Sequence, residues 1–178
     1  MVDLKKALED CGALQFGDFT LASGAKSSYY IDIKKASTKP EVLGAIARTM
    51  AEKMKELGLK PKRVAGVVLG SIPLATALSL ETGIPLLMVR KERKDHGTGI
   101  LVEGDLEPGD DVLVVEDVIT TAGSSMKAIN ELRGEGAKVC KVFSVIDREG
   151  GGRENLAGIG VELFALVKGS ELLRDASE

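Results

Sequence analysis

The chain has few of the residues that build disulfide-linked or zinc-binding proteins. Its 178 residues include two cysteines and one histidine, and Cys11 and Cys140 are far apart with no second pair of ligands beside them. This spacing argues against a disulfide and against a structural zinc site. We therefore expect two ordinary buried thiols.

Long apolar runs and an excess of positive charge are missing as well. No apolar stretch approaches 18 residues, and the first ten, MVDLKKALED, lack the apolar core of a signal peptide. We expect a cytoplasmic protein that binds no membrane. The 24 Lys and Arg residues are balanced by 27 Asp and Glu residues, for a formal charge of -3. No global basic field would therefore recruit nucleic acid.

What the sequence does contain is a regular alternation of strand and helix patterns after residue 60. Helical patterns begin near Pro73 and cover about 124–133, and apolar runs typical of strands cover 64–69, 84–90, 111–116, 137–147 and 159–167. Strands buried on both faces and alternating with helices are typical of a parallel sheet flanked by helices. We predict a single α/β domain over residues 1–178 with a mainly parallel central sheet.

The first third of the chain has a different pattern. Residues 2–11 read as a short amphipathic helix, and 15–35 as two short strands around a Ser-Gly turn. Residues 1–35 therefore form a small appendage. Thr38 and Glu41 have capping-box spacing before a long helix that Gly58 would end. We expect GGGR, residues 150–153, to be a flexible turn.

The stretch VLVVEDVITTAGSS, residues 112–125, carries the clearest chemical signal. Four apolar residues are followed at once by Glu116 and Asp117. If the strand stops near Val115, residues 120–124 form a turn whose backbone amides, hydroxyls and helix N-terminus can hold a phosphate. Carboxylates are acceptor-only groups that suit vicinal sugar hydroxyls. A phosphate site next to a site for two sugar hydroxyls indicates a ribose 5-phosphate. The alternative is that Ser124 caps a helix and the carboxylates are solvated.

Basic residues gather in RKERKDHG, residues 90–97, ahead of a second glycine. Arg90, Lys91, Lys94 and His96 on such a loop could close over a pyrophosphate and exclude water. The alternative is a solvated charge run with an incidental histidine. Competing phosphate motifs of the P-loop or dinucleotide-binding type are missing from the sequence.

Two further features have both a structural and a functional interpretation. Four of the six aromatic residues lie within residues 16–30, where they could stack on a planar ring or simply fill the core of the appendage. Arg148 follows a strand, and its guanidinium could bind a carboxylate in a planar fork or pair with Asp147 or Glu149 at the surface.

VLVVEDVITTAGSS resembles the phosphoribosyl pyrophosphate signature of the type I phosphoribosyltransferases, departing at Ala122, where glycine is common. Three further stretches are similar to parts of the orotate phosphoribosyltransferase family. FGDFTLASGAKSSYYIDIKK (16–35) resembles its hood, RKERKDHGTG (90–99) its mobile catalytic loop, and IDR (146–148) the place of its orotate-binding arginine. A Tyr-Lys pair of that family is replaced by Leu69 and Gly70.

The resemblance implies transfer of a phosphoribosyl group to orotate, giving orotidine 5′-monophosphate and pyrophosphate in pyrimidine (UMP) biosynthesis. It implies Mg²⁺ held mainly by the substrate, and a homodimer with shared active sites. The implied catalytic residues are Lys94, His96 and Asp117. The implied residues for phosphoribosyl pyrophosphate are Arg90, Lys91, Lys94, His96, Glu116, Asp117, Val118, Ile119, Thr120, Thr121, Ala122, Gly123 and Ser124. Those for orotate are Lys26, Tyr30, Ile31, Thr120 and Arg148.

Two other functions fit the same signature. One is a phosphoribosyltransferase for a purine or uracil, which the hood and Arg148 argue against. The other is a transcriptional regulator that binds phosphoribosyl pyrophosphate on the same fold. Such a regulator would need a basic face or an additional DNA-binding helix pair, and neither is visible in the sequence.

Overall fold

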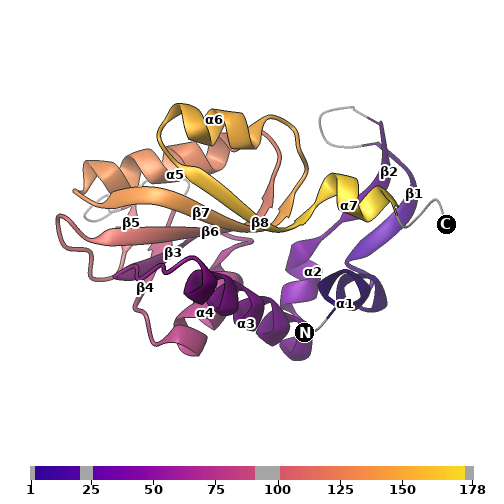
Figure 1. Cartoon of the computed structure of the whole chain (residues 1–178), viewed down its shortest axis with the longest axis horizontal. Helices are drawn as coiled ribbons and strands as arrows, with labels where there is room; N and C mark the ends of the chain where they lie inside the picture. Colours follow the sequence, from indigo (N-terminus) through magenta and orange to yellow (C-terminus); the bar gives the residue numbers. More distant parts are fainter. Residues whose placement is uncertain (1–2, 21–25, 91–100, 175–178) are drawn as a thin grey trace.

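A twisted six-stranded sheet forms the centre of the molecule (Figure 1), in a computed structural model that describes residues 3–20, 26–90 and 101–174. Its strands, in spatial order, are β5 (Val102–Glu103), β4 (Leu86–Val89), β3 (Arg63–Val67), β6 (Asp111–Ile119), β7 (Lys138–Asp147) and β8 (Glu162–Lys168). All neighbours pair in parallel except β5, which is antiparallel to β4. The predicted mainly parallel α/β fold is confirmed.

Helices cover both faces of this sheet (Figure 1). On one face lie α3 (Pro40–Glu56) and α4 (Ile72–Thr82), and on the other α5 (Gly123–Gly134) and α6 (Gly152–Gly158). Each face has its own core: along β3, Val64 packs into one cluster and Ala65 into the other, both with no exposed surface. Because successive side chains point to opposite faces, both faces need apolar residues. This is why the strands read as continuous apolar runs.

The elements that precede α3 form a small N-terminal appendage, called the hood below. Its elements are α1 (Leu4–Asp10), β1 (Leu14–Thr20), β2 (Lys26–Ile31) and α2 (Ile33–Ser37). Strands β1 and β2 pair antiparallel in a separate two-stranded sheet. Leu8, Tyr29 and Ile33 are buried in the same cluster as α3 and α4, so the hood packs on the main domain. The short helix α7 (Gly169–Arg174) follows β8 and lies next to the hood in Figure 1.

Several local expectations differ from the structure. The capping box at Thr38 is wrong, because the Thr38 hydroxyl donates to the Lys35 carbonyl at the end of α2, a helix the sequence reading missed. Helix α3 starts instead at Pro40, whose fixed φ suits a first helical position. Gly58, with φ +65°, follows the helix end as predicted. Cys11 is half-buried and Cys140 is exposed, so the expectation of two buried thiols is wrong.

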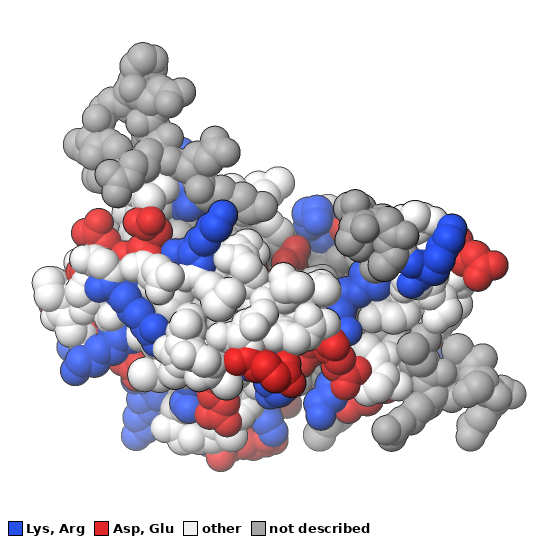
Figure 2. Space-filling model, turned by 90° about the horizontal axis from the view of Figure 1, so that it is seen from above, with Lys and Arg blue, Asp and Glu red and all other residues white. Residues whose placement is uncertain are grey.

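The surface of the described residues carries mixed charge. Lys and Arg side chains are interspersed with Asp and Glu over the face seen in Figure 2. Within the described ranges, no helix combines the length and the apolar character needed to cross a membrane.

Candidate active site

Strands β3 and β6, in the middle of the sheet, diverge at their carboxyl ends. Their last residue pair is Gly66 with Val115, whereas β6 continues along β7 to Ile119. From β3 the chain continues to β4 on one side, and from β6 it continues to β7 on the other. This is a topological switch point, where open α/β sheets bind ligands beyond the carboxyl ends of their strands.

Strand β6 is longer than the sequence reading expected. The prediction that it stops near Val115 is wrong, because pairing with β7 continues through Val118 and Ile119. Glu116 and Asp117 therefore belong to the strand and not to the turn after it. Val118 packs against one core and Ile119 against the other, so these two predicted ligands offer only their backbone to a bound molecule.

The turn between β6 and α5 comprises residues 120–122 and is called the β6–α5 turn below. Thr120 and Thr121 are exposed in it, as is Ser124 in the first turn of α5. The N-cap residue is Ala122, and no side chain caps the helix, so the alternative in which Ser124 caps it is not what the structure has. The first amides of this 12-residue helix therefore have no side-chain cap, and three exposed hydroxyl residues lie in the sequence around them.

Ala122 adopts a backbone conformation that usually belongs to glycine. Its φ is 63° and its ψ is 15°, in the left-handed region, and its side chain is buried. An L-residue there costs about 1–2 kcal/mol. The departure from glycine therefore leaves the tight turn intact, at the expense of local strain.

Helix α6 supports this turn from behind. A Cβ on Gly150 would lie 2.8 Å from the Thr120 methyl carbon, and one on Gly152 would lie 2.7 Å from the Thr120 carbonyl oxygen. Asn155 Nδ2 donates to the Thr121 carbonyl oxygen at 3.0 Å. The expectation that GGGR is a flexible turn is wrong, because two of its glycines allow close packing against the β6–α5 turn.

Glu116 is buried, with 5% of its surface exposed. Its Oε2 accepts from Ser71 Oγ at 3.1 Å, and its Oε1 accepts from Ser125 Oγ at 2.7 Å. The two serines come from different elements, because Ser71 is the N-cap residue of α4 and Ser125 lies in the first turn of α5.

Asp117 is half-buried and points toward the turn between β3 and α4, residues 68–71, called the β3–α4 turn below. Its Oδ1 accepts from the Val118 backbone N–H at 2.8 Å. The carboxyl carbon lies 2.8 Å from where a Cβ on Gly70 would be. The missing side chain at position 70 thus leaves the room that the Asp117 carboxylate occupies.

Arg90 follows β4 at the start of the basic segment. Its Nε donates to Glu103 Oε1 at 3.1 Å, and its backbone N–H donates to the Leu101 carbonyl. Arg90 and Ser124 both line a pocket of about 520 Å³, which also includes Lys127 of α5. The base of the basic segment is thereby near the N-terminus of α5. Residues 91–100, with the predicted Lys91, Lys94 and His96, lie outside the described residues.

Arg148 reaches the hood. Its Nη2 donates to Ser27 Oγ at 3.2 Å, and its guanidinium carbon lies 4.8 Å from the centre of the Tyr29 ring. Its backbone N–H donates to the Ile119 carbonyl, which ties it to the end of β6. Ser27 and Tyr29 were not predicted as site residues. The alternation in KSSYYI, which puts them on one face of the strand, could have identified them.

The other predicted orotate residues of the hood lie differently. Lys26 and Tyr30 are exposed on the opposite face of β2 from Ser27 and Tyr29, whereas the Ile31 side chain is buried. Lys26 Nζ donates to Thr20 Oγ1, and Tyr30 packs on Phe19 with ring centres 5.6 Å apart. The structure therefore brings Arg148, but not Lys26 or Tyr30, to the inner face of the hood.

The loop after Arg148 is tied to the C-terminal helix. Ser170 donates to Glu149 through its backbone N–H at 2.6 Å and through its hydroxyl at 3.1 Å. These hydrogen bonds, the backbone one foremost, lower the pKa of the Glu149 carboxyl below its ordinary value of 4.5. Next to them, a Cβ on Gly169 would lie 2.8 Å from the Tyr29 hydroxyl. The segment therefore packs closely around Tyr29 and Arg148.

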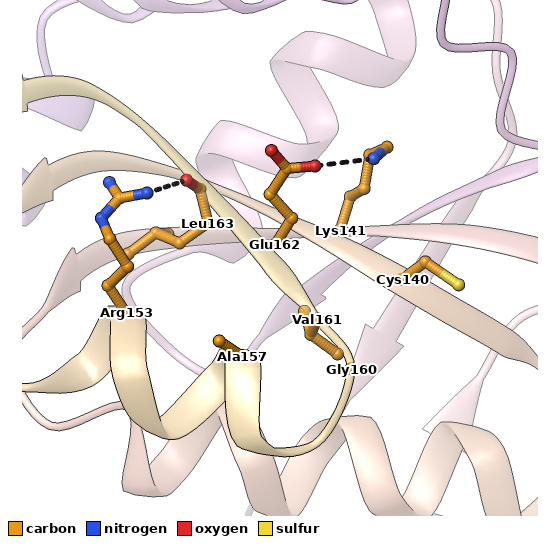
Figure 3. Close-up of a pocket in the computed structure, with 8 residues that line it drawn as sticks. All are labelled: Cys140, Lys141, Arg153, Ala157, Gly160, Val161, Glu162 and Leu163. Carbon is orange, nitrogen blue, oxygen red and sulfur yellow. Dashed lines mark hydrogen bonds and ion pairs between the residues drawn. The ribbon is translucent and has the colours of Figure 1, made fainter.

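Another pocket, of about 420 Å³, lies where β7 and β8 begin (Figure 3). Arg153 and Glu162 line it, and their polar atoms already bind the Leu163 carbonyl and Lys141. It includes none of the described residues that were predicted for the site. Among the residues the structure describes, no three His, Cys, Asp or Glu side chains gather into a group that could hold a metal ion.

Comparisons with known proteins agree with this geometry. Residues 34–160 match the phosphoribosyl transferase domain family. The chain is 49% identical to an orotate phosphoribosyltransferase from Pyrococcus abyssi over 98% of this chain and 96% of the relative. It also resembles the crystal structure of orotate phosphoribosyltransferase from Aeropyrum pernix, with a TM-score of 0.84, 33% identity, and coverage of 98% and 99%.

A second solved structure is orotate phosphoribosyltransferase from Mycobacterium tuberculosis in complex with 5-phospho-α-D-ribosyl 1-diphosphate. The TM-score is 0.78 and the identity 30%, over 96% of this chain and 99% of that one.

Proposed function

The chain belongs to the phosphoribosyl transferase family, among the orotate phosphoribosyltransferases, and from this premise we propose how its site works. The enzyme transfers the phosphoribosyl group of phosphoribosyl pyrophosphate to orotate, in pyrimidine biosynthesis. The bond from the anomeric carbon to pyrophosphate breaks, a bond to a ring nitrogen of orotate forms, and that nitrogen loses its proton. The observation that carries the assignment is the uncapped α5 N-terminus beside Asp117 at the β3–β6 switch point.

The β6–α5 turn holds the 5-phosphate of the substrate. Thr120, Thr121 and Ser124 supply hydroxyls, and the backbone of Ala122 and Gly123 leads into the helix N-terminus. Such an end is a ready anion site because its amides have no intrahelical partner. Asp117 is the carboxylate open toward the ribose. It accepts from the sugar hydroxyls and places negative charge near the carbon where positive charge develops as the bond breaks.

Pyrophosphate leaves between the β3–α4 turn and the basic segment. With glycine at position 70 in place of the family's lysine, backbone amides of that turn and the side chains of Arg90, Lys91, Lys94 and His96 bind the departing charge. Arg90 supports this because it shares a pocket with Ser124. The residues present suit a Mg²⁺ ion held mainly by substrate phosphates, with Asp117 as the nearby protein carboxylate. When bound, the ion would neutralise charge on the diphosphate.

Orotate binds next to Arg148, where this residue meets the hood. The guanidinium is held by Ser27 and Tyr29, and it can bind the carboxylate that distinguishes orotate from uracil. Thr120, the first residue of the β6–α5 turn, lies next to this position, since Arg148 is tied to Ile119 immediately before it. Lys26, Tyr30 and the backbone of Ile31 remain proposed contacts that would require the hood to adjust around the bound base.

We also propose one functional domain over residues 1–178, with 1–35 as the hood, assembled as a cytoplasmic homodimer. In the dimer Lys94 completes the partner's site. Mixing Lys94→Ala with Asp117→Asn tests this, because a mixed dimer has one site with both defects and one with neither. Random mixing should restore roughly a quarter of wild-type activity. If subunits exchange and no activity returns, Lys94 acts within its own chain.

The function itself is tested by following orotate absorbance with Mg²⁺, with and without phosphoribosyl pyrophosphate, next to parallel reactions with uracil, adenine and hypoxanthine. We expect consumption of orotate that depends on phosphoribosyl pyrophosphate, and release of one pyrophosphate for each orotidine 5′-monophosphate. Efficient use of another base, with orotate untouched, would contradict the proposal.

A further inference from the structure

Tyr29 is a buried residue of the hood that contacts both Arg148 and helix α7. It lies in β2 with 6% of its surface exposed, in the same cluster as Leu172 of α7. The guanidinium carbon of Arg148 lies over its ring, 4.8 Å from the ring centre. The Tyr29 hydroxyl lies next to Gly169, the first residue of α7, where an added Cβ would be only 2.8 Å away. The ring of Tyr29 therefore meets Arg148, and its hydroxyl meets Gly169.

Gly169 leaves the room that the Tyr29 hydroxyl needs. Its φ is not positive, so the backbone conformation itself does not require a glycine. After the hydroxyl oxygen, the atoms nearest to an added Cβ would be Arg148 Cα and the Asp147 carbonyl oxygen, each at an ordinary 3.5 Å. The carbons of the Tyr29 ring would be at least as distant. The Tyr29 hydroxyl is therefore the group that a methyl at position 169 would displace.

The Arg148 side chain is held on the hood by a second contact as well. Its Nη2 donates to Ser27 Oγ at 3.2 Å, and Ser27 lies on the same face of β2 as Tyr29. Of the five N–H donors of a guanidinium, the bond to Ser27 uses one. Donors of the fork are thus left for a ligand, while the position of the fork is fixed by two residues of one strand.

An arginine whose side chain is already held in place loses less conformational entropy when it binds a ligand. The planar guanidinium binds a carboxylate through two parallel N–H bonds, so the interaction depends on where the fork lies. Uracil has no carboxylate and gains nothing from this arrangement. Support of the Arg148 side chain thus favours a pyrimidine that carries a carboxylate.

We propose that Tyr29 and Ser27 are positioning residues that set the specificity for orotate, and that Gly169 sets the place of Tyr29. Both hood residues act through Arg148. Helix α7 thereby influences the choice of base through the contact between Gly169 and the Tyr29 hydroxyl. The inference rests on the proposed function, in which Arg148 binds the carboxylate of orotate.

Gly169→Ala tests this contact. The Tyr29 hydroxyl would have to retreat by roughly 0.6 Å, from 2.8 Å to an ordinary 3.4 Å, and the ring under Arg148 would move with it. A misplacement of about 1 Å can cost about 10²-fold, so we expect the KM for orotate to rise about 10-fold. The carboxylate does not react, so kcat should stay unchanged. The KM for phosphoribosyl pyrophosphate at saturating orotate should stay unchanged too.

Tyr29→Phe shows whether the effect passes through the hydroxyl. Without that oxygen, the nearest contacts of the new methyl are at 3.5 Å. In the Tyr29→Phe background, Gly169→Ala should therefore change the KM for orotate by less than about 2-fold. Gly158→Ala is the matched control, because Gly158 is the last residue of α6 and a Cβ there would meet nothing within 4 Å. It should leave all constants unchanged.

Ser27→Ala tests the other contact of Arg148. Loss of the hydrogen-bond acceptor should raise the KM for orotate about 2- to 10-fold and leave that for phosphoribosyl pyrophosphate unchanged. Ser28→Ala is its control, because Ser28 is the next residue of β2 and is exposed on the opposite face. It should change neither constant. If Gly169→Ala does not fold, the two serine variants decide in the same assay.

Three results would overturn the inference. The first is an unchanged KM for orotate in a folded Gly169→Ala or Ser27→Ala variant. The second is a rise that persists when Gly169→Ala is made in the Tyr29→Phe background. The third is an equal loss for phosphoribosyl pyrophosphate, which would mean that Tyr29 only supports the hood. In each case an active wild type leaves the proposed function standing. A wild type that does not consume orotate would refute the proposed function, and with it this inference.

Discussion

Replacing Gly70 with alanine puts a methyl group where the Asp117 carboxylate rests. The new Cβ would lie 2.8 Å from the Asp117 carboxyl carbon, and ordinary contacts begin near 3.4 Å. The carboxyl carbon therefore has to retreat by roughly 0.6 Å, from 2.8 to 3.4 Å, and Oδ2, which lies nearer still to the new methyl group, by more, unless the carboxylate rotates away. Misplacing a reacting group by about 1 Å can lower a rate about 10²-fold. We expect Gly70→Ala to lower kcat/KM for phosphoribosyl pyrophosphate about 10- to 10²-fold.

The assay is steady-state consumption of orotate at varied phosphoribosyl pyrophosphate, with thermal unfolding measured in parallel. Gly134→Ala is the control, because Gly134 is the last residue of α5 and a Cβ there would meet nothing within 4 Å. It should leave kcat/KM unchanged. If Gly70→Ala is folded and as active as the Gly134 variant, then the position of the Asp117 carboxylate against Gly70 does not matter to the reaction.

Three other changes test separate parts of the site. Lys94→Ala should lower kcat roughly 10²–10³-fold with little change in substrate binding, because leaving-group charge develops mainly in the transition state; near wild-type turnover in a stopped-flow or steady-state assay would remove Lys94 from the chemistry. Arg148→Ala should lose up to about 10⁴-fold in kcat/KM for orotate but little for uracil, and an equal loss for both bases would mean that Arg148 only supports the hood. Hydrogen bonds from Ser170 lower the pKa of the Glu149 carboxyl below 4.5, so the ionised carboxylate stabilises the folded state above pH 4.5. This contribution is lost as the pH falls through the lowered pKa. Glu149→Gln should therefore show a smaller fall of Tm below pH 4.5 than the wild type, and identical Tm curves would contradict this.

The order of the main strands along the chain could be predicted because strands that are buried on both faces are apolar at every position. Runs such as Val112 to Val115 are apolar at every position, since neighbours along β6 pack into different cores. The short helices α2 and α6 have no comparable pattern of apolar residues. Helix α6 begins in a Gly-rich stretch that reads as a turn, and its close packing against Thr120 depends on residues about 30 positions away.

The candidate site was predictable where local chemistry decides, and not where side-chain direction does. The hydroxyl-rich turn and the helix after it could be inferred from residues 120–124. The different surroundings of the Glu116 and Asp117 side chains could not, because they depend on Gly70 and Ser71 before α4 and on Ser125 in α5, which the fold brings to β6. In the hood, the identity of the aromatic residues suggested Tyr30, but alternation along β2 turns Tyr29 toward Arg148 instead.

The central claim is that Asp117 and the β6–α5 turn hold phosphoribosyl pyrophosphate. Its most direct measurement is a calorimetric titration of phosphoribosyl pyrophosphate with Mg²⁺ into the wild type and Asp117→Asn. Asp111→Asn serves as control, because Asp111 is exposed at the other end of the same strand. A hydrogen bond to a charged group contributes about 1.5–3 kcal/mol, so Kd should rise roughly 10- to 150-fold in Asp117→Asn and stay unchanged in the control. An unchanged Kd in a folded Asp117→Asn variant would contradict the account.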